Sequence, residues 1–254
     1  MGKYIKFIFV IFISAIGFAQ EQTIHISNDT FHNLYYDKGQ IIPNHDRMKV
    51  VDYISEKIVN KDIPEDYSFR IEVGTCENEK KNDTFISYKR LEYLFNYLDI
   101  KYNLKKEKFQ FHFSDSEFCD VYQKDNVSFV NFALQNCTVV LKGDSDIHNN
   151  ISKKIFYSKN NIIPTGKGKK LLSLIGSKIT DSNILDKYGL RVQIAICDKE
   201  SKNNPLLSYE RIEYLLNYLE EEYKIKREKV QFEFINNDKK NKTSFLRFVL
   251  IYCR

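Results

Sequence analysis

One twelve-residue segment occurs twice in this chain with only small changes. SYKRLEYLFNYL spans Ser87–Leu98, and SYERIEYLLNYL spans Ser208–Leu219, 121 positions further on. Nine of the twelve aligned positions are identical. A repeat of this kind indicates that one folding unit has been duplicated, and it constrains the fold more than any local pattern does.

The repeat extends well beyond this segment. At the same spacing, Arg70 aligns with Arg191. Further along, the first copy is five residues longer, so that Cys137 aligns with Cys253. A polar stretch rich in Asp and Asn separates the copies and is typical of a linker. We therefore expect two tandem units, 31–138 and 153–254, joined by a linker at 139–152.

The first nineteen residues have the order of a secretory signal peptide. Lys3 and Lys6 form a basic start, an almost wholly apolar run follows, and Gly17 and Ala19 occupy the −3 and −1 positions of a cleavage site. The alternative is a membrane anchor, but the apolar core of about twelve residues is shorter than the ~20 that a spanning helix needs. We therefore expect cleavage after Ala19 and a periplasmic or otherwise exported protein, with no transmembrane segment in the mature chain.

The charge of the mature chain does not favour a nucleic acid partner. Removal of the signal peptide takes away two basic residues and lowers the formal net charge from +5 to +3. Such a balance is ordinary for a soluble protein. We expect no binding of nucleic acid.

Hydrophobic periodicity predicts the order β-α-β-α-β-β for each unit, an α+β fold. In the second unit an apolar stripe of Tyr, Ile and Leu follows Ser208 at helical spacing, and Ser208 is expected to be the N-cap of that helix. The expected strands of this unit lie at 154–163, 190–196, 229–234 and 244–253, and the expected helices at 166–179 and 208–219.

Three segments of the second unit resemble the OmpA-like C-terminal domain, a periplasmic peptidoglycan-binding module. FYSKNNIIPTG (156–166) resembles the first strand, turn and helix start of that family. Cys197-Asp198 stands where the family has a Thr-Asp pair, and NPLLSYERIEYLLNYL (204–219) resembles its Asn-x-x-Leu-Ser-x-x-Arg-Ala helix start. The resemblance implies, for each unit, a two-layer sandwich of two helices on a four-stranded mixed sheet. It also implies peptidoglycan as the partner, with no cofactor.

The resemblance also implies a binding site. In that family, an acid after strand two and an Arg on helix two hold the diaminopimelate of the peptide stem. Asp198 and Arg211 match these positions in the second unit, with Asn204 and Ser208 in the same helix-start motif. Glu77 and Arg90 match them in the first unit.

The chemistry of this pair suits a ligand that carries both charges. The diaminopimelate end has a carboxylate and an ammonium on one carbon, and a guanidinium can bind the carboxylate in a bidentate manner while the acid binds the ammonium. The alternative is that acid and Arg form an ordinary surface ion pair, which contributes only ~0–1 kcal/mol. The sequence departs from the family in a shorter acid-to-Arg loop and in the loss of Arg residues from the last strand.

Two further hypotheses therefore stay open. The chain could be a divergent scaffold that has lost wall binding and serves as a protein-interaction or structural module in the envelope. It could also be a secreted enzyme, but the sequence contains no Gly-x-Ser-x-Gly, no Cys-x-x-Cys and no His-x-x-x-His pattern. We expect a non-enzymatic protein without a metal site.

Export would permit disulfides among the five cysteines: Cys76, Cys119, Cys137, Cys197 and Cys253. Their odd number leaves at least one unpaired or intermolecular. In the family, strand four runs antiparallel beside strand two. Cys197 and Cys253 would then lie at opposite ends of neighbouring strands, roughly 20 Å apart, too far for a bridge. We expect buried thiols or a bridge between the units.

Overall fold

The computed structural model describes residues 33–60, 68–114, 128–135, 137–139, 151–181, 184–236 and 243–253. The expected signal peptide, Cys119 and most of the expected linker lie outside these residues. Within the described part, the protein combines helices with one mixed β-sheet. No helix among these residues has both the length and the apolar character needed to cross a membrane.

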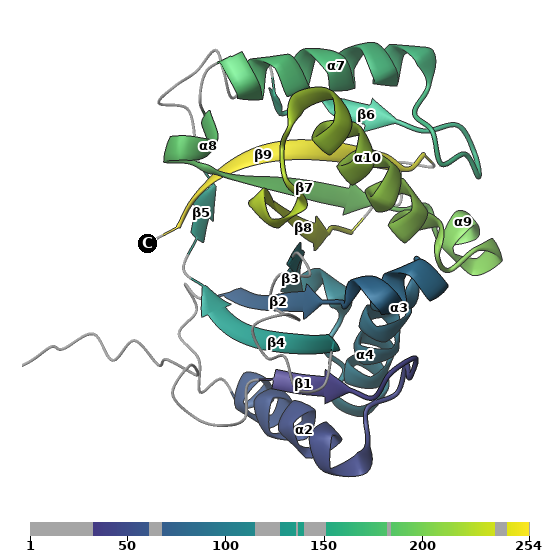
Figure 1. Ribbon diagram of the computed structural model, residues 1–254, viewed down its shortest axis with the longest axis vertical. Helices are drawn as coiled ribbons and strands as arrows, with labels where there is room; N and C mark the ends of the chain where they lie inside the picture. Colours follow the sequence, from purple (N-terminus) through teal and green to yellow (C-terminus); the bar gives the residue numbers. More distant parts are fainter. Residues whose placement is uncertain are drawn as a thin grey trace, which may run out of the picture.

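The elements up to residue 139 and those after residue 150 follow one another in nearly the same order (Figure 1). The first half contains β1 (Asn33–Tyr36), α2 (His45–Val59), β2 (Ser68–Gly74), α3 (Glu77–Asn82), α4 (Ile86–Tyr102), the 3-10 turn η2 (Lys106–Lys108), β3 (Phe109–Ser114), β4 (Ser128–Gln135) and β5 (Cys137–Val139). The second half contains β6 (Lys154–Phe156), α7 (Gly166–Asp181), α8 (Ile184–Lys187), β7 (Gly189–Ala195), α9 (Asp198–Asn203), α10 (Leu207–Tyr223), the 3-10 turn η3 (Arg227–Lys229), β8 (Val230–Phe234) and β9 (Phe245–Cys253).

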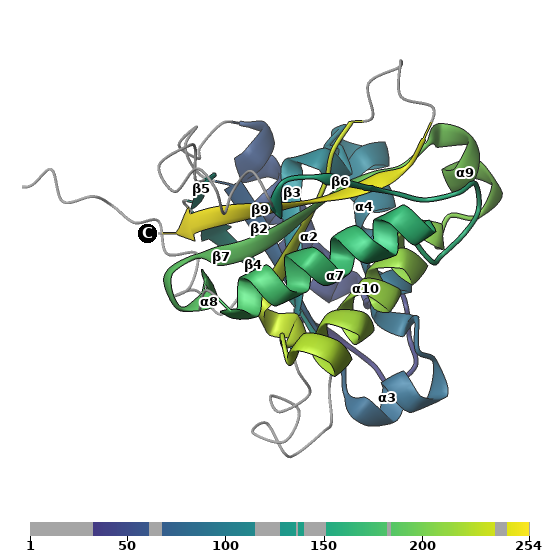
Figure 2. The same cartoon turned by 90° about the horizontal axis from the view of Figure 1, so that it is seen from above.

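The repeated twelve-residue segments form most of α4 and α10. Their apolar positions recur every three or four residues and are buried against the sheet, as an amphipathic helix requires. Both helices end on a residue in the left-handed region, Asn103 at φ 54° and Lys224 at φ 57°, a common way to stop a helix. Figure 2 shows α10 lying beside α7 along the strands of the second half.

The start of α10 differs from the sequence expectation. Ser208 is not the N-cap but the second residue of the helix, and it is buried. The N-cap is Leu206, and its N–H is bound by the side-chain oxygen of Asn204 at 3.0 Å. Asp83 binds the N–H of Phe85 in the same way ahead of α4, also at 3.0 Å. A short polar side chain two residues before the cap therefore shapes each turn.

The strands join into a single nine-stranded sheet rather than two separate four-stranded sheets. The order is β1-β4-β2-β3-β8-β7-β9-β5, and β6 also pairs with β9. The two halves meet where β3 runs antiparallel to β8, with Phe111 directly opposite Phe232. These two residues are 121 positions apart, so each half presents the same strand to the other. Such self-complementary contact is the geometry of a twofold interface.

The core is continuous across this junction. The rings of Phe111 and Phe232 stack with centroids 5.6 Å apart. The rings of Tyr88 of α4 and Tyr209 of α10 also pack together, with centroids 5.3 Å apart. These two residues again occupy equivalent positions in the repeat. The aromatic residues of the two halves therefore form one hydrophobic core.

Within each half the neighbouring strands run as the resemblance implies. β4 is antiparallel to β2, and β9 is antiparallel to β7.

The structure also shows the state of three cysteines. Cys76 and Cys137 are disulfide-bonded, whereas Cys197 is a free thiol. Cys197 therefore forms no bridge within its half. Cys137 lies opposite Cys253 in the antiparallel pairing of β5 with β9.

Candidate functional site

The Arg of the first half is buried and bound by its own chain. The Nη1 and Nη2 atoms of Arg90 donate to the two carboxylate oxygens of Glu79 at 3.1 and 2.8 Å. Its Nε donates to the backbone carbonyl of Gln40 at 2.8 Å. Its guanidinium also lies over the ring of Tyr36, with the central carbon 4.5 Å from the ring centroid. The side chain is only 1% exposed.

The second half repeats this arrangement. Arg211 donates from Nη2 to Glu200 at 3.0 Å and from Nε to the carbonyl of Asn161 at 2.9 Å. The guanidinium carbon lies 4.5 Å from the ring centroid of Tyr157, and the side chain is again 1% exposed. Every partner of Arg211 named here stands 121 positions after its counterpart around Arg90.

Each Glu receives further hydrogen bonds besides those from the Arg. Ser128 donates to Glu79, and Ser244 donates to Glu200. The N–H of Gly39 donates to Glu79 at 2.6 Å, and the N–H of Asn160 donates to Glu200 at the same distance. Gly39 and Asn160 both have a positive φ, 72° and 58°, so a left-handed turn places each N–H at the carboxylate.

These contacts decide the charge state of both acids. Burial would raise the pKa of Glu79, but the hydrogen bonds from Arg90, Ser128 and Gly39 outweigh it and hold the pKa below its ordinary value. At Glu200, burial would likewise raise the pKa, but the hydrogen bonds from Arg211, Ser244 and Asn160 outweigh it and hold the pKa below its ordinary value. Both carboxylates are therefore ionised in the folded protein at neutral pH.

The acids expected from the resemblance lie elsewhere. Glu77 is exposed at the start of α3 and forms an ion pair with Lys81 at 2.9 Å. Hydrogen bonding to Lys81 lowers the pKa of Glu77. Asp198 is the first residue of α9, and its side chain lies outside the described part of the structure. The structure thus joins Arg90 to Glu79 and not to Glu77.

The other two expected site residues, Asn204 and Ser208, lie at the start of α10. The amide of Asn204 donates to Glu210 at 3.0 Å while its oxygen binds the N–H of Leu206. Ser208 is buried within α10. The predicted pairing of Asp198 with Arg211 stays a prediction, because the side chain of Asp198 lies outside the described part of the structure.

Sequence reasoning missed Glu79 and Glu200, although a signal for them existed. Both acids stand eleven positions before their Arg and are identical in the two copies. At the neighbouring acid position the copies differ, with Glu77 in the first half and Asp198 in the second. Identity between the copies was therefore the better guide to the residues that bind the arginines.

Both Glu–Arg–Ser networks are buried within the protein. Groups of the protein itself bind all three nitrogens of the Arg90 guanidinium. They bind Nε and Nη2 of Arg211, whereas its Nη1 is buried without a hydrogen-bond partner among the described residues. Almost none of either arginine side chain is exposed. Within the described residues there is also no group of three or more His, Cys, Asp or Glu side chains arranged to hold a metal ion. The geometry of both networks is that of a structural element.

No family model, no curated protein and no solved structure matches this chain.

Proposed function

We propose that the protein is an exported, non-enzymatic module of the cell envelope, built on a duplicated and diverged OmpA-like scaffold. In this proposal the scaffold has lost diaminopimelate binding and serves structural or protein-interaction roles. The observation that carries it is the pairing of Arg90 with Glu79 and of Arg211 with Glu200. An internal carboxylate occupies each guanidinium that a wall peptide would need.

The energetics of these pairs argue against exchange for a ligand. Breaking a buried ion pair leaves an uncompensated charge and costs about 3–5 kcal/mol. A wall carboxylate that replaced Glu200 at Nη2 of Arg211 would leave that Glu without its guanidinium partner. The same cost applies at Arg90, where the contact with Glu79 is bidentate.

Two observations support export. The basic-then-apolar order of the first nineteen residues is typical of a signal peptide. Disulfides such as those of Cys76 and Cys137 persist in oxidising compartments and are rare in the cytosol. The mass of the protein secreted by a bacterial host tests this part, because cleavage after Ala19 leaves a chain that begins at Gln20.

Sedimentation with insoluble peptidoglycan sacculi that contain diaminopimelate tests the loss of wall binding. The proposal predicts that the mature protein stays in the supernatant at physiological salt, as a serum albumin control does. Pelleting of the wild type, combined with release by Asp198→Asn or Glu77→Gln, would restore the wall-binding hypothesis. These two substitutions leave both buried pairs intact, so that a change in pelleting is not a consequence of unfolding.

A further inference from the structure

One segment of the second half, 151–180, carries seven lysines and no acid. All seven lysine side chains are exposed, and none of them forms an ion pair with another described residue. The first acid that follows is Asp181, the last residue of α7. In Figure 1 the two elements of this segment, β6 and α7, lie at the end of the molecule opposite β1 and α2. This end therefore presents an unmatched positive charge.

The repeat supplies an internal comparison for this charge. The counterpart segment, 30–59, has the same length and contains four acids and four lysines or arginines. Its acids match its cations, since Asp46 pairs with Lys49 at 2.8 Å and Asp37 with Arg47 at 3.2 Å. Both segments form a strand, a turn and a helix of the same scaffold. The fold itself therefore does not require an excess of lysine in the second copy.

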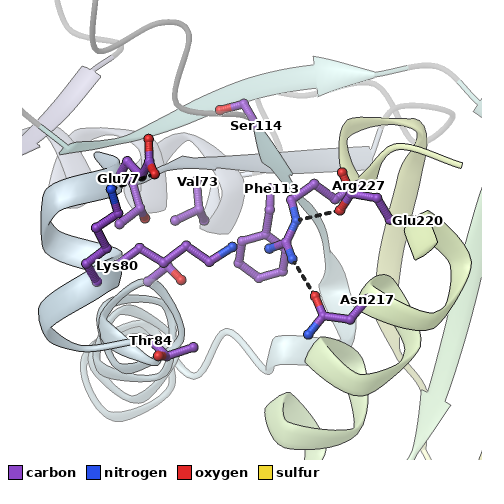
Figure 3. A pocket seen from close by; sticks show the side chains of 12 residues that line it. Val73, Glu77, Lys80, Thr84, Phe113, Ser114, Asn217, Glu220 and Arg227 are labelled. Carbon is purple, nitrogen blue, oxygen red and sulfur yellow. Dashed lines mark hydrogen bonds and ion pairs between the residues drawn. The ribbon is translucent and has the colours of Figure 1, made fainter. Parts of the chain in front are cut away.

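The cleft between the two halves, of about 480 Å³, differs from this end in its charge (Figure 3). Lys81 pairs with Glu77 at 2.9 Å. Arg227 lies 3.9 Å from Glu220 and donates to Asn217 at 3.1 Å. Acids of the protein thus match the cations of the cleft, whereas the lysines of 151–180 have no such partners among the described residues.

The helix α7 has two distinct sides. One side is buried against the sheet and includes Leu172 and Ile175. The neighbouring helix α10 contacts α7 at Ser173, whose hydroxyl lies 2.9 Å from that of Tyr223. Another side is open to solvent, and Leu174 on it is 43% exposed. Helical spacing brings five side chains together there, and these form the α7 stripe: Lys167, Lys170, Leu171, Leu174 and Lys178.

The loop that leads into α7 adds an apolar tip. Ile162 is 38% exposed and Ile163 is 47% exposed, and these two residues form the isoleucine tip. The buried network holds the backbone directly before it, because Nε of Arg211 donates to the carbonyl of Asn161 at 2.9 Å. A tip that is held in this way does not have to be ordered when a partner binds it, which favours binding.

We propose that the α7 stripe and the isoleucine tip bind the surface of a membrane that contains anionic phospholipid. Lysines close to such a surface are attracted by its negative charge. Exposed isoleucine and leucine side chains enter the boundary between headgroups and acyl chains. A nucleic acid would match the lysines through its phosphates but would leave the isoleucine tip in water. This proposal concerns an exposed surface and does not depend on the proposed function.

Co-sedimentation of the mature protein with lipid vesicles tests the proposal. The vesicles contain phosphatidylglycerol and phosphatidylcholine in equal amounts, and vesicles of phosphatidylcholine alone are the uncharged comparison. At about 0.1 M salt the protein should pellet with the anionic vesicles and stay in the supernatant with the uncharged ones. Binding should weaken as the salt concentration is raised, because salt screens the attraction.

The repeat provides matched variants for the lysines. Lys170→Gln with Lys178→Gln should weaken binding to the anionic vesicles about 25-fold, since each lysine near such a surface contributes about fivefold. Lys49→Gln with Lys57→Gln changes the equivalent positions of α2 and should leave binding unchanged. All four side chains are exposed, so that loss of folding does not explain a difference between the two variants.

A second matched pair tests the apolar contact. Ile163→Ser should weaken binding to the anionic vesicles about fivefold, whereas Ile42→Ser, at the equivalent exposed position of the first copy, should leave it unchanged. A DNA duplex is the alternative polyanion, and the protein should bind it more weakly than it binds the vesicles.

Four outcomes would overturn the proposal. The wild type stays in the supernatant with both kinds of vesicle, or it pellets equally with both. The α2 lysine variant loses as much binding as the α7 lysine variant. Ile163→Ser binds as tightly as Ile42→Ser, or the DNA duplex binds as tightly as the vesicles, which would indicate a general site for polyanions. None of these outcomes bears on sedimentation with sacculi, because the vesicles contain no peptidoglycan and the variants retain Glu77 and Asp198.

Discussion

The hydroxyl of Tyr88 donates a hydrogen bond of 2.5 Å to Glu213, which lies 125 residues further along the chain. The equivalent Tyr209 donates to Glu92 at 2.7 Å. The repeated segment therefore binds its own copy reciprocally, Tyr to Glu in both directions. The duplicated helices thus add a second contact between the two halves, beside the pairing of β3 with β8.

Replacing Tyr88 with Phe tests this contact. Glu213 is buried, and burial opposes the low pKa that its hydrogen bonds from Arg227 and Tyr88 maintain. A hydrogen bond to a charged group contributes about 1.5–3 kcal/mol, and we expect Tyr88→Phe to lower the free energy of unfolding by this amount. Urea denaturation at pH 7 measures it. Tyr209→Phe should cost less, because Glu92 is only half-buried, and equal stability of Tyr88→Phe and wild type would contradict the account.

Replacing Arg211 with Ala should destabilise the protein strongly. The substitution leaves Glu200 buried beside Ser244 without its cation, and such a loss costs about 3–5 kcal/mol. Arg211→Lys should recover only part of this, because an ammonium does not reproduce the contacts with both Glu200 and the Asn161 carbonyl. Denaturant midpoints measure the series. Glu77→Gln, which changes an exposed acid of α3 in the other half, is the control and should change stability by less than about 0.5 kcal/mol.

Stability should fall in acid because of Glu79 and Glu200. The folded protein holds both pKa values below the ordinary value, which in an unfolded chain is about 4.3. The unfolded state therefore binds more protons, and the stabilisation is present above the unfolded pKa and is lost as the pH falls through the folded pKa.

The matched variant for this pH dependence is Glu79→Gln with Glu200→Gln. Its free energy of unfolding should be lower than that of the wild type at pH 7 and should depend less on pH between about 5 and 3. Thermal unfolding followed across this range measures both curves. Parallel curves for the two proteins would mean that these carboxylates do not titrate as described.

Peptide mapping should find Cys137 joined to Cys253 and one free thiol, at Cys197. Cys76 and Cys137 lie beyond opposite ends of the antiparallel pair β2–β4. With seven residues in β2 at ~3.3 Å each, they are too far apart to bond each other. The register instead places Cys137 opposite Cys253. Reduction should cost about 2–4 kcal/mol, and a bridge that includes Cys197 would contradict this assignment.

The repeat and the local periodicity were enough to predict the four long helices and most of the strands, but not the short helices α3, α8 and α9. The antiparallel neighbours β2–β4 and β7–β9 followed from the resemblance. The single sheet could not be predicted in this way, because alternation along a strand does not show which strand edge is covered. All six residues of β3 are buried, which in hindsight is typical of a strand enclosed at a junction.

The candidate site was predictable only in part. The sequence singled out both arginines, and the structure gives them equivalent partners, but which acid binds each one depends on side-chain directions after a strand exit. Glu77 and Glu79 both stand at the start of α3, and only Glu79 is buried. The resemblance predicted Glu77 as the acid that acts with Arg90, whereas in the folded chain Glu79 binds Arg90.

NMR of the arginine side chains tests the central claim most directly. The Nε–H groups of Arg90 and Arg211 donate to the carbonyls of Gln40 and Asn161. We predict that both signals exchange slowly with water at pH 7 and do not shift when a diaminopimelate-containing muropeptide is added to millimolar concentration. A saturable shift of either signal by the muropeptide would contradict the claim that these arginines are committed to the protein's own glutamates.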